Sequence, residues 1–271
     1  MAADIFAGTT VLITGASRGI GAAFAQILAG WRADLVLAAR TEADLRYIAH
    51  RCEERGARVR TVIADLRDPA TPAALLAGLE GDGVTVDHLI NNAGIGPFGR
   101  ASDAPLERQL NAIEVNVRAA TELALRLLPG MVARRRGGIL NVASTAAFQG
   151  MPFMSVYSGT KAYLLTWGEA IWRELRGTGV RCCTLCPGPT DTDFFEANGL
   201  RVDVPTALFQ EPEQVALLGL NAYLKDRSHI VPGMTNLVGS LAVRLSPRRW
   251  ATKVSGGYAK PRDEAPGTVT P

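Results

Sequence analysis

The stretch TGASRGIG at Thr14–Gly21 decides the fold, because it joins an apolar, strand-like run to a segment with helical spacing. Glycines after a strand allow a tight turn and let a ligand approach the backbone closely. The helix that follows would offer free N–H groups and the positive end of its dipole to a pyrophosphate. A glycine-rich turn without a ligand is the simpler alternative. In a chain that alternates strands and helices, this position favours a dinucleotide site.

Short apolar runs alternate with longer segments of helical spacing along the whole chain. The runs expected to form strands are Thr10–Thr14, Asp34–Ala38, Val59–Ala64, Val86–Asn91, Gly138–Val142 and Val180–Cys186. The clearest helical segments are Ile20–Trp31, Glu42–Arg55, Pro105–Arg118 and Val156–Arg176. This repetition predicts parallel strands with helices on both faces. We expect an α/β fold of the Rossmann type, a doubly wound parallel sheet of about seven strands.

The domain organisation is simple, since residues 8–235 contain no linker rich in Gly, Ser or Pro and no internal repeat. We expect one domain over residues 1–235, including a substrate loop at about 190–212. Residues 236–254 resemble a basic amphipathic extension, with Leu237, Leu241 and Leu245 opposite Arg244, Arg248 and Arg249. Residues 255–271 are rich in Gly, Pro and charge, which predicts a disordered tail.

Composition excludes several classes of function. The net charge of +3 gives no case for nucleic acid as a partner. No apolar stretch reaches the roughly 18 residues of a spanning helix, and no signal peptide is evident, so a cytoplasmic protein is expected. The three histidines are scattered and predict no metal site. Cys183 and Cys186 form a CxxC pair within an apolar strand, where buried thiols are expected rather than a metal or redox site.

The residue at the end of the second strand distinguishes the two nicotinamide cofactors. An acid there would bind the ribose hydroxyls of NAD, but this strand ends in Arg40. A cation at that point can pair with the 2′-phosphate of NADP, and Arg18 of the glycine turn can approach the same group. The alternative is that Arg40 is only a solvated surface charge. The two arginines favour NADP(H).

Tyr157 and Lys161 are four residues apart and lie on one face of an expected helix. A phenol titrates near pH ~10 and becomes a useful base only where a neighbouring cation stabilises its anion. A tyrosine and a lysine at this spacing are common in helices, so the pair alone does not indicate catalysis. Three segments at the carboxyl ends of other strands add to it: Asn91–Gly94, where a nucleotide could pass closely, Ser144, which could hold a substrate oxygen, and Pro187–Thr192, whose Thr192 could bind the carboxamide.

Together these segments resemble the short-chain dehydrogenase/reductase family in its compact single-domain branch. The resemblance covers residues 8–235 and rests on motifs in family order: Thr14–Gly21, Asp65, Asn91–Gly94, Asn116, Ser144, Tyr157/Lys161 and Pro187–Thr192. The run Leu35–Arg40, and Val231–Gly233 before a basic helix, are most similar to broad-specificity NADP-dependent bacterial reductases. Gly159 and Thr160 depart from the family, where Ala and Ser are more usual.

The resemblance implies an NADP-dependent oxidoreductase acting on CH–OH and carbonyl groups, with NAD the less expected cofactor. It implies catalytic roles for Ser144, Tyr157 and Lys161, and for Asn116, which in the family keeps a water in a proton relay with the lysine. Lys161 is expected to lower the pKa of Tyr157 and to hold the cofactor ribose. The residues expected to bind the cofactor are Gly15, Ser17, Arg18, Gly19, Ile20, Gly21, Arg40, Asp65, Leu66, Asn92, Ala93, Gly94, Tyr157, Lys161, Pro187, Gly188, Thr190 and Thr192.

Apolar residues near the expected site suggest a hydrophobic substrate, such as a ketone, a 3-oxoacyl chain or a steroid-like ring system. They are Phe148, Met151, Phe153, Met154, Phe194, Phe195, Leu200 and Phe209. Ordinary core packing is the alternative for several of them. The competing functions are a non-catalytic NADP sensor or scaffold and a sugar-nucleotide epimerase, although the chain lacks the extra domain of the latter.

Two expectations concern partners. Residues 236–253 are expected to pack near the substrate entrance or a subunit contact, with weak binding to an anionic membrane as the second interpretation. The family implies a homodimer or homotetramer, formed through the helices around Pro105–Leu128 and Val156–Arg176.

Overall fold

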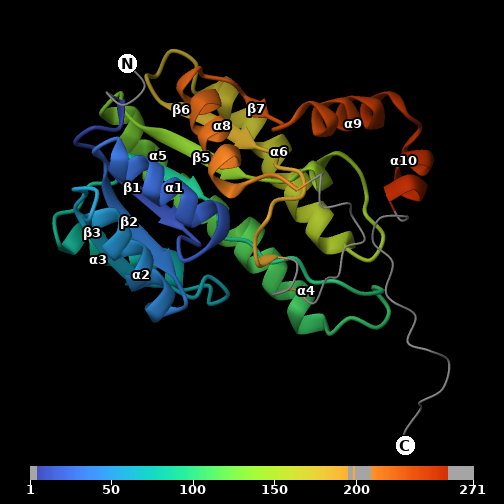
Figure 1. The fold of residues 1–271 in the computed structure, drawn as a ribbon, viewed down its shortest axis with the longest axis horizontal. Helices are drawn as coiled ribbons and strands as arrows, with labels where there is room; N and C mark the ends of the chain where they lie inside the picture. The colour runs from blue at the N-terminus through green and yellow to red at the C-terminus, as the bar shows by residue number, and fades with distance from the viewer. Residues whose placement is uncertain (1–4, 195–197, 199–208, 256–271) are drawn as a thin grey trace, which may run out of the picture.

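One parallel sheet of seven strands organises the chain in a computed structural model that describes residues 5–194, 198 and 209–255 (Figure 1). The strands are β1 Thr10–Thr14, β2 Asp34–Ala39, β3 Val59–Ile63, β4 His88–Asn91, β5 Gly138–Val142, β6 Arg181–Leu185 and β7 His229–Ile230. Their order in the sheet is β3-β2-β1-β4-β5-β6-β7. The chain reverses its direction of winding between β1 and β4, which is where doubly wound folds bind ligands.

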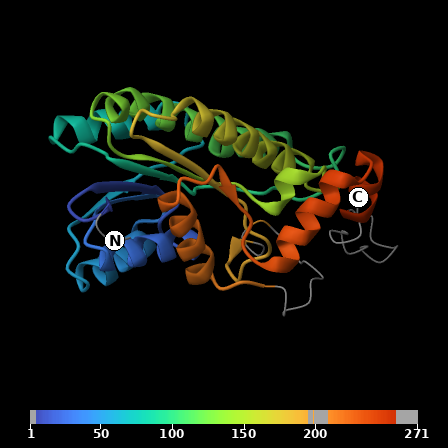
Figure 2. The ribbon, with the colours of Figure 1, turned by 90° about the horizontal axis from the view of Figure 1, so that it is seen from above.

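Helices cover both faces of the sheet (Figure 2). One face carries α1 Gly19–Gly30, α2 Glu42–Glu53 and α8 Pro212–Leu224. The other carries α3 Thr71–Gly81, α4 Leu106–Ile113, α5 Ala120–Ala133 and α6 Ser155–Glu174. Strand β2 shows why helices cover both faces of the sheet. Leu35 and Leu37 join the core on the α1 side, whereas Val36 and Ala38 join the core on the α3 side. Alternating side chains that are all apolar require cover on both faces.

The expected strands all form, and β1 and β5 have the predicted bounds. The helix expected at Pro105–Arg118 forms, but its winding changes within it. α4 ends at Ile113, a π-helical segment follows at Glu114–Ala119, and α5 continues to Ala133. π-helical turns are rare in proteins, and those that do occur are often found at functional sites.

Two C-terminal helices follow β7: α9 Met234–Leu245 and α10 Arg248–Ser255. They lie at the end of the molecule away from α1, α2 and α3 (Figures 1 and 2). Among the described residues, no helix has both the length and the apolarity to cross a membrane. Residues 256–271, where a disordered tail is expected, lie outside the described part of the chain.

Candidate active site

The glycine turn between β1 and α1 lets a ligand approach its backbone closely. Gly15 and Gly19 have φ of +64° and +54°, in the left-handed region that favours glycine. A Cβ at Gly21 would lie 2.2 Å from the carbonyl oxygen of Gly15, so no larger residue fits there. α1 starts without a side-chain cap at Arg18. Its first N–H groups therefore remain available to an anion.

The end of β4 fixes the shape of this turn. The Asn92 side-chain amide donates to the carbonyl oxygens of Thr14 and Gly15, each at 3.0 Å. In return, the Thr14 hydroxyl accepts from the backbone N–H groups of Asn92 and Ala93, each at 3.1 Å. Asn92, which is expected to contact the cofactor, therefore also fixes the backbone conformation of the glycine turn.

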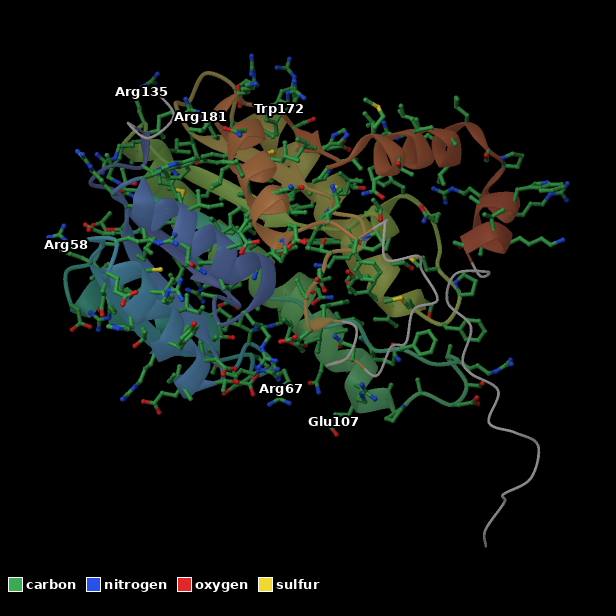
Figure 3. The ribbon with its side chains drawn as sticks, viewed as in Figure 1. Arg58, Arg67, Glu107, Arg135, Trp172 and Arg181 are labelled. Atoms are coloured by element: carbon green, nitrogen blue, oxygen red, sulfur yellow. The ribbon has the colours of Figure 1, made fainter. Side chains whose placement is uncertain are left out.

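Charged side chains gather where β2 and β3 end. Arg67 donates from Nε to both carboxylate oxygens of Asp65, each at 2.9 Å, and this hydrogen bond chiefly lowers the pKa of Asp65. Figure 3 shows Arg67 at the edge of the molecule, near Glu107 of α4. Arg40 is exposed and lines the same hollow. Sequence reasoning missed Arg67, because an arginine two residues after the aspartate is an ordinary surface charge until the loop brings the pair together.

Arg18 is already engaged in ion pairs. Its guanidinium lies 2.9 Å from the Asp44 carboxylate of α2 and 3.7 Å from that of Asp193. Asp193 belongs to the loop after β6, and Thr192 of that loop faces Gly19, where a Cβ would come within 2.9 Å of the threonine methyl. The loop after β6 therefore covers the glycine turn.

Ser144, Tyr157 and Lys161 come together beside the ends of β5 and β6. Ser144 caps the short 3₁₀ helix Thr145–Phe148, accepting from the Ala146 N–H at 3.1 Å, and its hydroxyl donates to the Pro187 carbonyl at 3.5 Å. The same hydroxyl is close enough to the Tyr157 phenol to lower its pKa. Lys161 is 3% exposed and donates to the Val142 carbonyl at 2.8 Å.

Burial dominates the ionisation of this group. It raises the pKa of Tyr157 to about 12, against a smaller lowering by the Ser144 hydrogen bond. It lowers the pKa of Lys161 to about 8. Burial and Ser144 account for the shift at Tyr157, and the expected lowering of the phenol pKa by Lys161 stays a prediction. The Lys161 ammonium lies 5.7 Å from the Tyr157 ring centroid and is bonded to a backbone carbonyl, so desolvation prevails.

Asn116 lies in the π-helical segment and bonds to neighbouring protein groups. Its Oδ1 accepts from the Ile95 N–H, and its Nδ2 donates to the Ile95 carbonyl and the Thr160 hydroxyl, all at 2.9 Å. Thr160 in turn donates to the Tyr157 carbonyl at 2.7 Å. Asn116 thus ties the loop after β4 to the turn of α6 that carries the tyrosine. Gly94 separates Asn116 from Lys161, because a Cβ there would lie 3.2 Å from Nζ and 3.4 Å from Oδ1.

A single cavity of about 920 Å³ connects these groups. Every expected catalytic and cofactor residue lines it except Gly21 and Asn116, which lie behind the lining. Of the apolar residues proposed for the substrate, Met151, Met154 and Phe194 line the cavity, whereas Phe148, Phe153 and Phe209 do not. Phe195 and Leu200 lie outside the described residues. Residues 236–253 were expected to pack near the substrate entrance or a subunit contact, and part of the lining does come from α9 and α10: Thr235, Asn236, Gly239, Ser240, Ala242, Val243, Trp250, Ala251, Val254 and Ser255.

A model of the short chain dehydrogenase family matches residues 9–201, more than half of the chain. The chain belongs to the short-chain dehydrogenase/reductase family. It is therefore an oxidoreductase that binds a nicotinamide cofactor and acts on carbonyl or alcohol groups. The Rossmann-type sheet agrees with that membership.

Curated relatives and a solved structure are similar over most of the chain. The ketoacyl reductase HetN of Nostoc sp. is 33% identical over 86% of this chain and 82% of its own length. A very-long-chain 3-oxoacyl-CoA reductase of Phaeosphaeria nodorum is 32% identical over 76% of this chain and 61% of its own. A short-chain dehydrogenase from Sphingobium yanoikuyae in complex with NADPH has 32% identity and a TM-score of 0.78, covering 88% of this chain and 95% of its own.

The cysteines of this short-chain dehydrogenase are free and buried. Burial raises the pKa of the Cys183 thiol to about 12, so it is an unreactive core group at neutral pH. Within the described ranges, no three His, Cys, Asp or Glu residues come together in a way that could hold a metal ion.

Proposed function

We propose that this short-chain dehydrogenase moves hydride between NADP(H) and a hydrophobic ketone or secondary alcohol, with Tyr157 as the proton donor and acceptor. One observation carries the proposal: the same cavity contains the arginine-lined end of β2, the Ser144–Tyr157–Lys161 group and, beyond it, apolar side chains. The cofactor end and the reacting end are thus joined without intervening protein.

The preference for NADP(H) rests on charge at the end of β2. Arg40 stands where an acid would bind ribose hydroxyls, and it is exposed. Among the described residues its charge acts weakly on the Asp65 carboxylate, whose main partner is Arg67. Arg18 is partly neutralised by Asp44, and Arg67 by Asp65. Arg40 is therefore the cation best placed to receive a 2′-phosphate. The NADPH bound in the Sphingobium relative is consistent with this assignment.

The proton step follows from the arrangement of the hydroxyls. NADPH held at the glycine turn would supply the hydride for the carbonyl carbon, and NADP⁺ held there would accept it from the alcohol. The phenol of Tyr157 gives its proton to the carbonyl oxygen as that oxygen gains charge. The Ser144 hydroxyl, which lies near the same phenol, would turn from the Pro187 carbonyl to donate its proton to the substrate oxygen. Lys161 holds the cofactor ribose and, as an ammonium, stabilises the phenolate left after proton transfer.

The substrate class rests on the lining next to Tyr157. Met151, Met154 and Phe194 supply apolar surface, and the Phe194 ring centroid lies 5.6 Å from that of Tyr157. Val243 and Trp250 continue this surface beneath the C-terminal helices. An apolar chamber gains most from a long or bulky substrate, because each buried methylene contributes about 0.8 kcal/mol. Ketoacyl chains and steroid-like ketones fit that description.

A substrate panel tests the proposal. NADPH consumption is followed by absorbance with 2-ketones and 3-oxoacyl thioesters of increasing chain length, a steroid ketone and small polar sugars. We expect kcat/KM to rise with apolar size until the chamber is filled, and NADPH to exceed NADH with each substrate. Turnover confined to small polar sugars would contradict the apolar chamber, and a preference for NADH would contradict the role of Arg40.

We also propose that the chain forms a homodimer or homotetramer through one apolar face. Three large side chains of α4 are exposed there: Leu106 at 72%, Leu110 at 50% and Ile113 at 41%. Leu125 of α5 and Tyr163 of α6 are exposed as well, at 48% and 37%. A monomer would leave this surface in water, whereas a second copy would cover it.

A further inference from the structure

Helix α9 turns its large apolar side chains away from the protein, whereas a helix packed on a protein usually buries them. Its large apolar side chains point outward: Met234 is 74% exposed, Val238 57%, Leu241 50% and Leu245 89%. Its inward side carries small and polar residues. Ser240 is 7% exposed, and Asn236 donates to the Gln210 side chain at 3.0 Å. The apolar row therefore contributes nothing to the core, and a surface outside the described residues must cover it if it is to be covered at all.

Cations border this apolar row without any acid among them. Arg248, Arg249 and Lys253 are exposed, and so is Arg244, although its guanidinium lies 5.9 Å from the Phe148 ring centroid. The chain from residue 227 to residue 255 contains no Asp or Glu. Figure 3 shows nitrogen-tipped side chains extending outward from α10, away from the sheet. An apolar row next to several cations is the pattern of a helix that lies in the plane of an anionic membrane surface.

Other occupants of this face fit less well. Residues 256–271 contain three prolines, three glycines and four charged side chains, and offer little apolar surface to lay over α9. A second copy of the chain, related by a two-fold axis, would bring the same cations together with no acid in the segment to balance them. An anionic lipid surface satisfies both the apolar row and the charge.

The cavity opens near this face. Trp250 and Val254 line the cavity, yet they are 57% and 61% exposed, so they lie at its rim. The inner side of α9 lines the same cavity through Gly239, Ser240 and Val243. A molecule leaving a bilayer beneath α9 and α10 would thus be close to the opening.

We propose that the outer face of α9 and α10 docks on an anionic lipid surface, with the apolar row in contact with acyl chains and the arginines in contact with headgroups. This inference is independent of the proposed substrate, since it concerns a surface that the chemistry does not use.

Vesicle co-sedimentation of the full chain tests the proposal. The probes are vesicles of equal parts phosphatidylglycerol and phosphatidylcholine, against phosphatidylcholine alone. The variants are Leu241→Gln/Leu245→Gln and Arg248→Gln/Arg249→Gln. The matched control is Leu217→Gln on α8, where the leucine is 42% exposed on a face without the cations. Circular dichroism and light scattering report folding and mass for each protein.

We expect the wild type and the α8 control to sediment with the anionic vesicles and to be released by salt. Each double variant should lower the vesicle partition coefficient at least about tenfold, since it removes two leucine contacts or two headgroup contacts. Failure of the wild type to sediment would overturn the proposal, as would unchanged binding by a folded Leu241→Gln/Leu245→Gln protein. A fall in mass for that variant without vesicle binding would assign the face to a second copy instead.

Discussion

Tyr157 and Lys161 lie inside the cavity at 8% and 3% exposure, where little water is available to stabilise their charged forms. Desolvation favours the neutral form of both side chains. It raises the pKa of Tyr157 to about 12 and lowers the pKa of Lys161 to about 8. A phenol that holds its proton through neutral pH is suited to protonate the carbonyl oxygen while hydride reduces the carbonyl carbon. The reverse reaction requires the phenolate and is favoured at higher pH.

The first prediction concerns pH. Lys161 loses its charge as pH rises through its lowered pKa of about 8, so carbonyl reduction should stay level below that value and decline above it. Alcohol oxidation should instead rise with pH, because proton removal from Tyr157 becomes easier. Initial rates in both directions over a pH series measure this. Parallel profiles in the two directions would contradict the assignment.

The second prediction concerns Arg40. Arg40→Gln removes the exposed cation at the end of β2, so KM for NADPH should rise roughly tenfold, as expected for one lost charge-assisted hydrogen bond. KM for NADH should change little. Arg46→Gln is the control, because Arg46 is 73% exposed on α2 and pairs with Glu42. Equal effects on both cofactors would show that Arg40 does not read the 2′-phosphate.

The residues of the site were predictable where one local pattern carries them. Tyr157 and Lys161 share a helix face, and Ser144 follows a strand, so sequence spacing alone brings them to one edge of the sheet. Asp44 was not predictable, because it meets Arg18 only once the glycine turn and α2 are placed side by side. Arg67 was not predictable either, because a separation of two residues does not show that its guanidinium turns onto the Asp65 carboxylate. The dominance of burial over charge at Tyr157 also depends on packing that no spacing rule contains.

At the scale of elements, α6 carries two glycines with opposite surroundings. A Cβ at Gly159 would meet nothing within 4 Å, whereas one at Gly168 would lie 2.1 Å from the Thr184 hydroxyl oxygen of β6. The close approach of α6 to β6 at Gly168 helps to set where Tyr157 and Lys161 sit against the sheet.

The third prediction follows from that contrast. Gly159→Ala should raise the free energy of unfolding by about 0.5–1 kcal/mol, through helix propensity, and leave kcat unchanged. Gly168→Ala should destabilise by about 1–3 kcal/mol, because the added methyl must displace a buried strand residue. Urea unfolding of the two variants measures both values. A stable, active Gly168→Ala protein would show that this helix–strand contact can relax.

The element types were predictable because the central strands, such as β2 and β5, are apolar on both sides and the helices have clear spacing. The π-helical segment at Glu114–Ala119 was not. Its residues have ordinary helical spacing, and the wide turn arises where Asn116 bonds to Ile95 and Thr160 instead of facing away from the site. Tertiary hydrogen bonds, which are invisible to periodicity, select that geometry.

At the scale of the whole molecule, the apolar face of α4 and α5 is the proposed subunit contact. The fourth prediction is that the wild type has the mass of a dimer or tetramer by light scattering, and that Leu110→Asp lowers it by placing charge in a covered apolar surface. Leu217→Asp on α8 is the control, since Leu217 has similar exposure, 42% against 50%. A monomeric wild type would contradict the proposal.

The overall architecture could be predicted from the order of strands and helices, and packing of the C-terminal segment near the substrate entrance was expected too, but the side of α9 that meets the enzyme could not be predicted. The spacing of Leu237, Leu241 and Leu245 suggests a face that packs on the enzyme. In the structure Leu241 and Leu245 point away, and small residues face the cavity instead. A one-dimensional pattern identifies an amphipathic helix without stating which side meets the protein.

The central claim is that Tyr157 transfers the proton in an NADP(H)-dependent reaction, and Tyr157→Phe tests it most directly. The substitution removes one hydroxyl and keeps the ring that packs on Phe194. NADPH affinity, measured by fluorescence titration, should be unchanged, while kcat with the best ketone of the panel should fall by about 10²–10⁴-fold. Undiminished turnover in Tyr157→Phe would contradict the mechanism, and a wild type that binds NADPH but turns over no carbonyl or alcohol would favour a sensor over an enzyme.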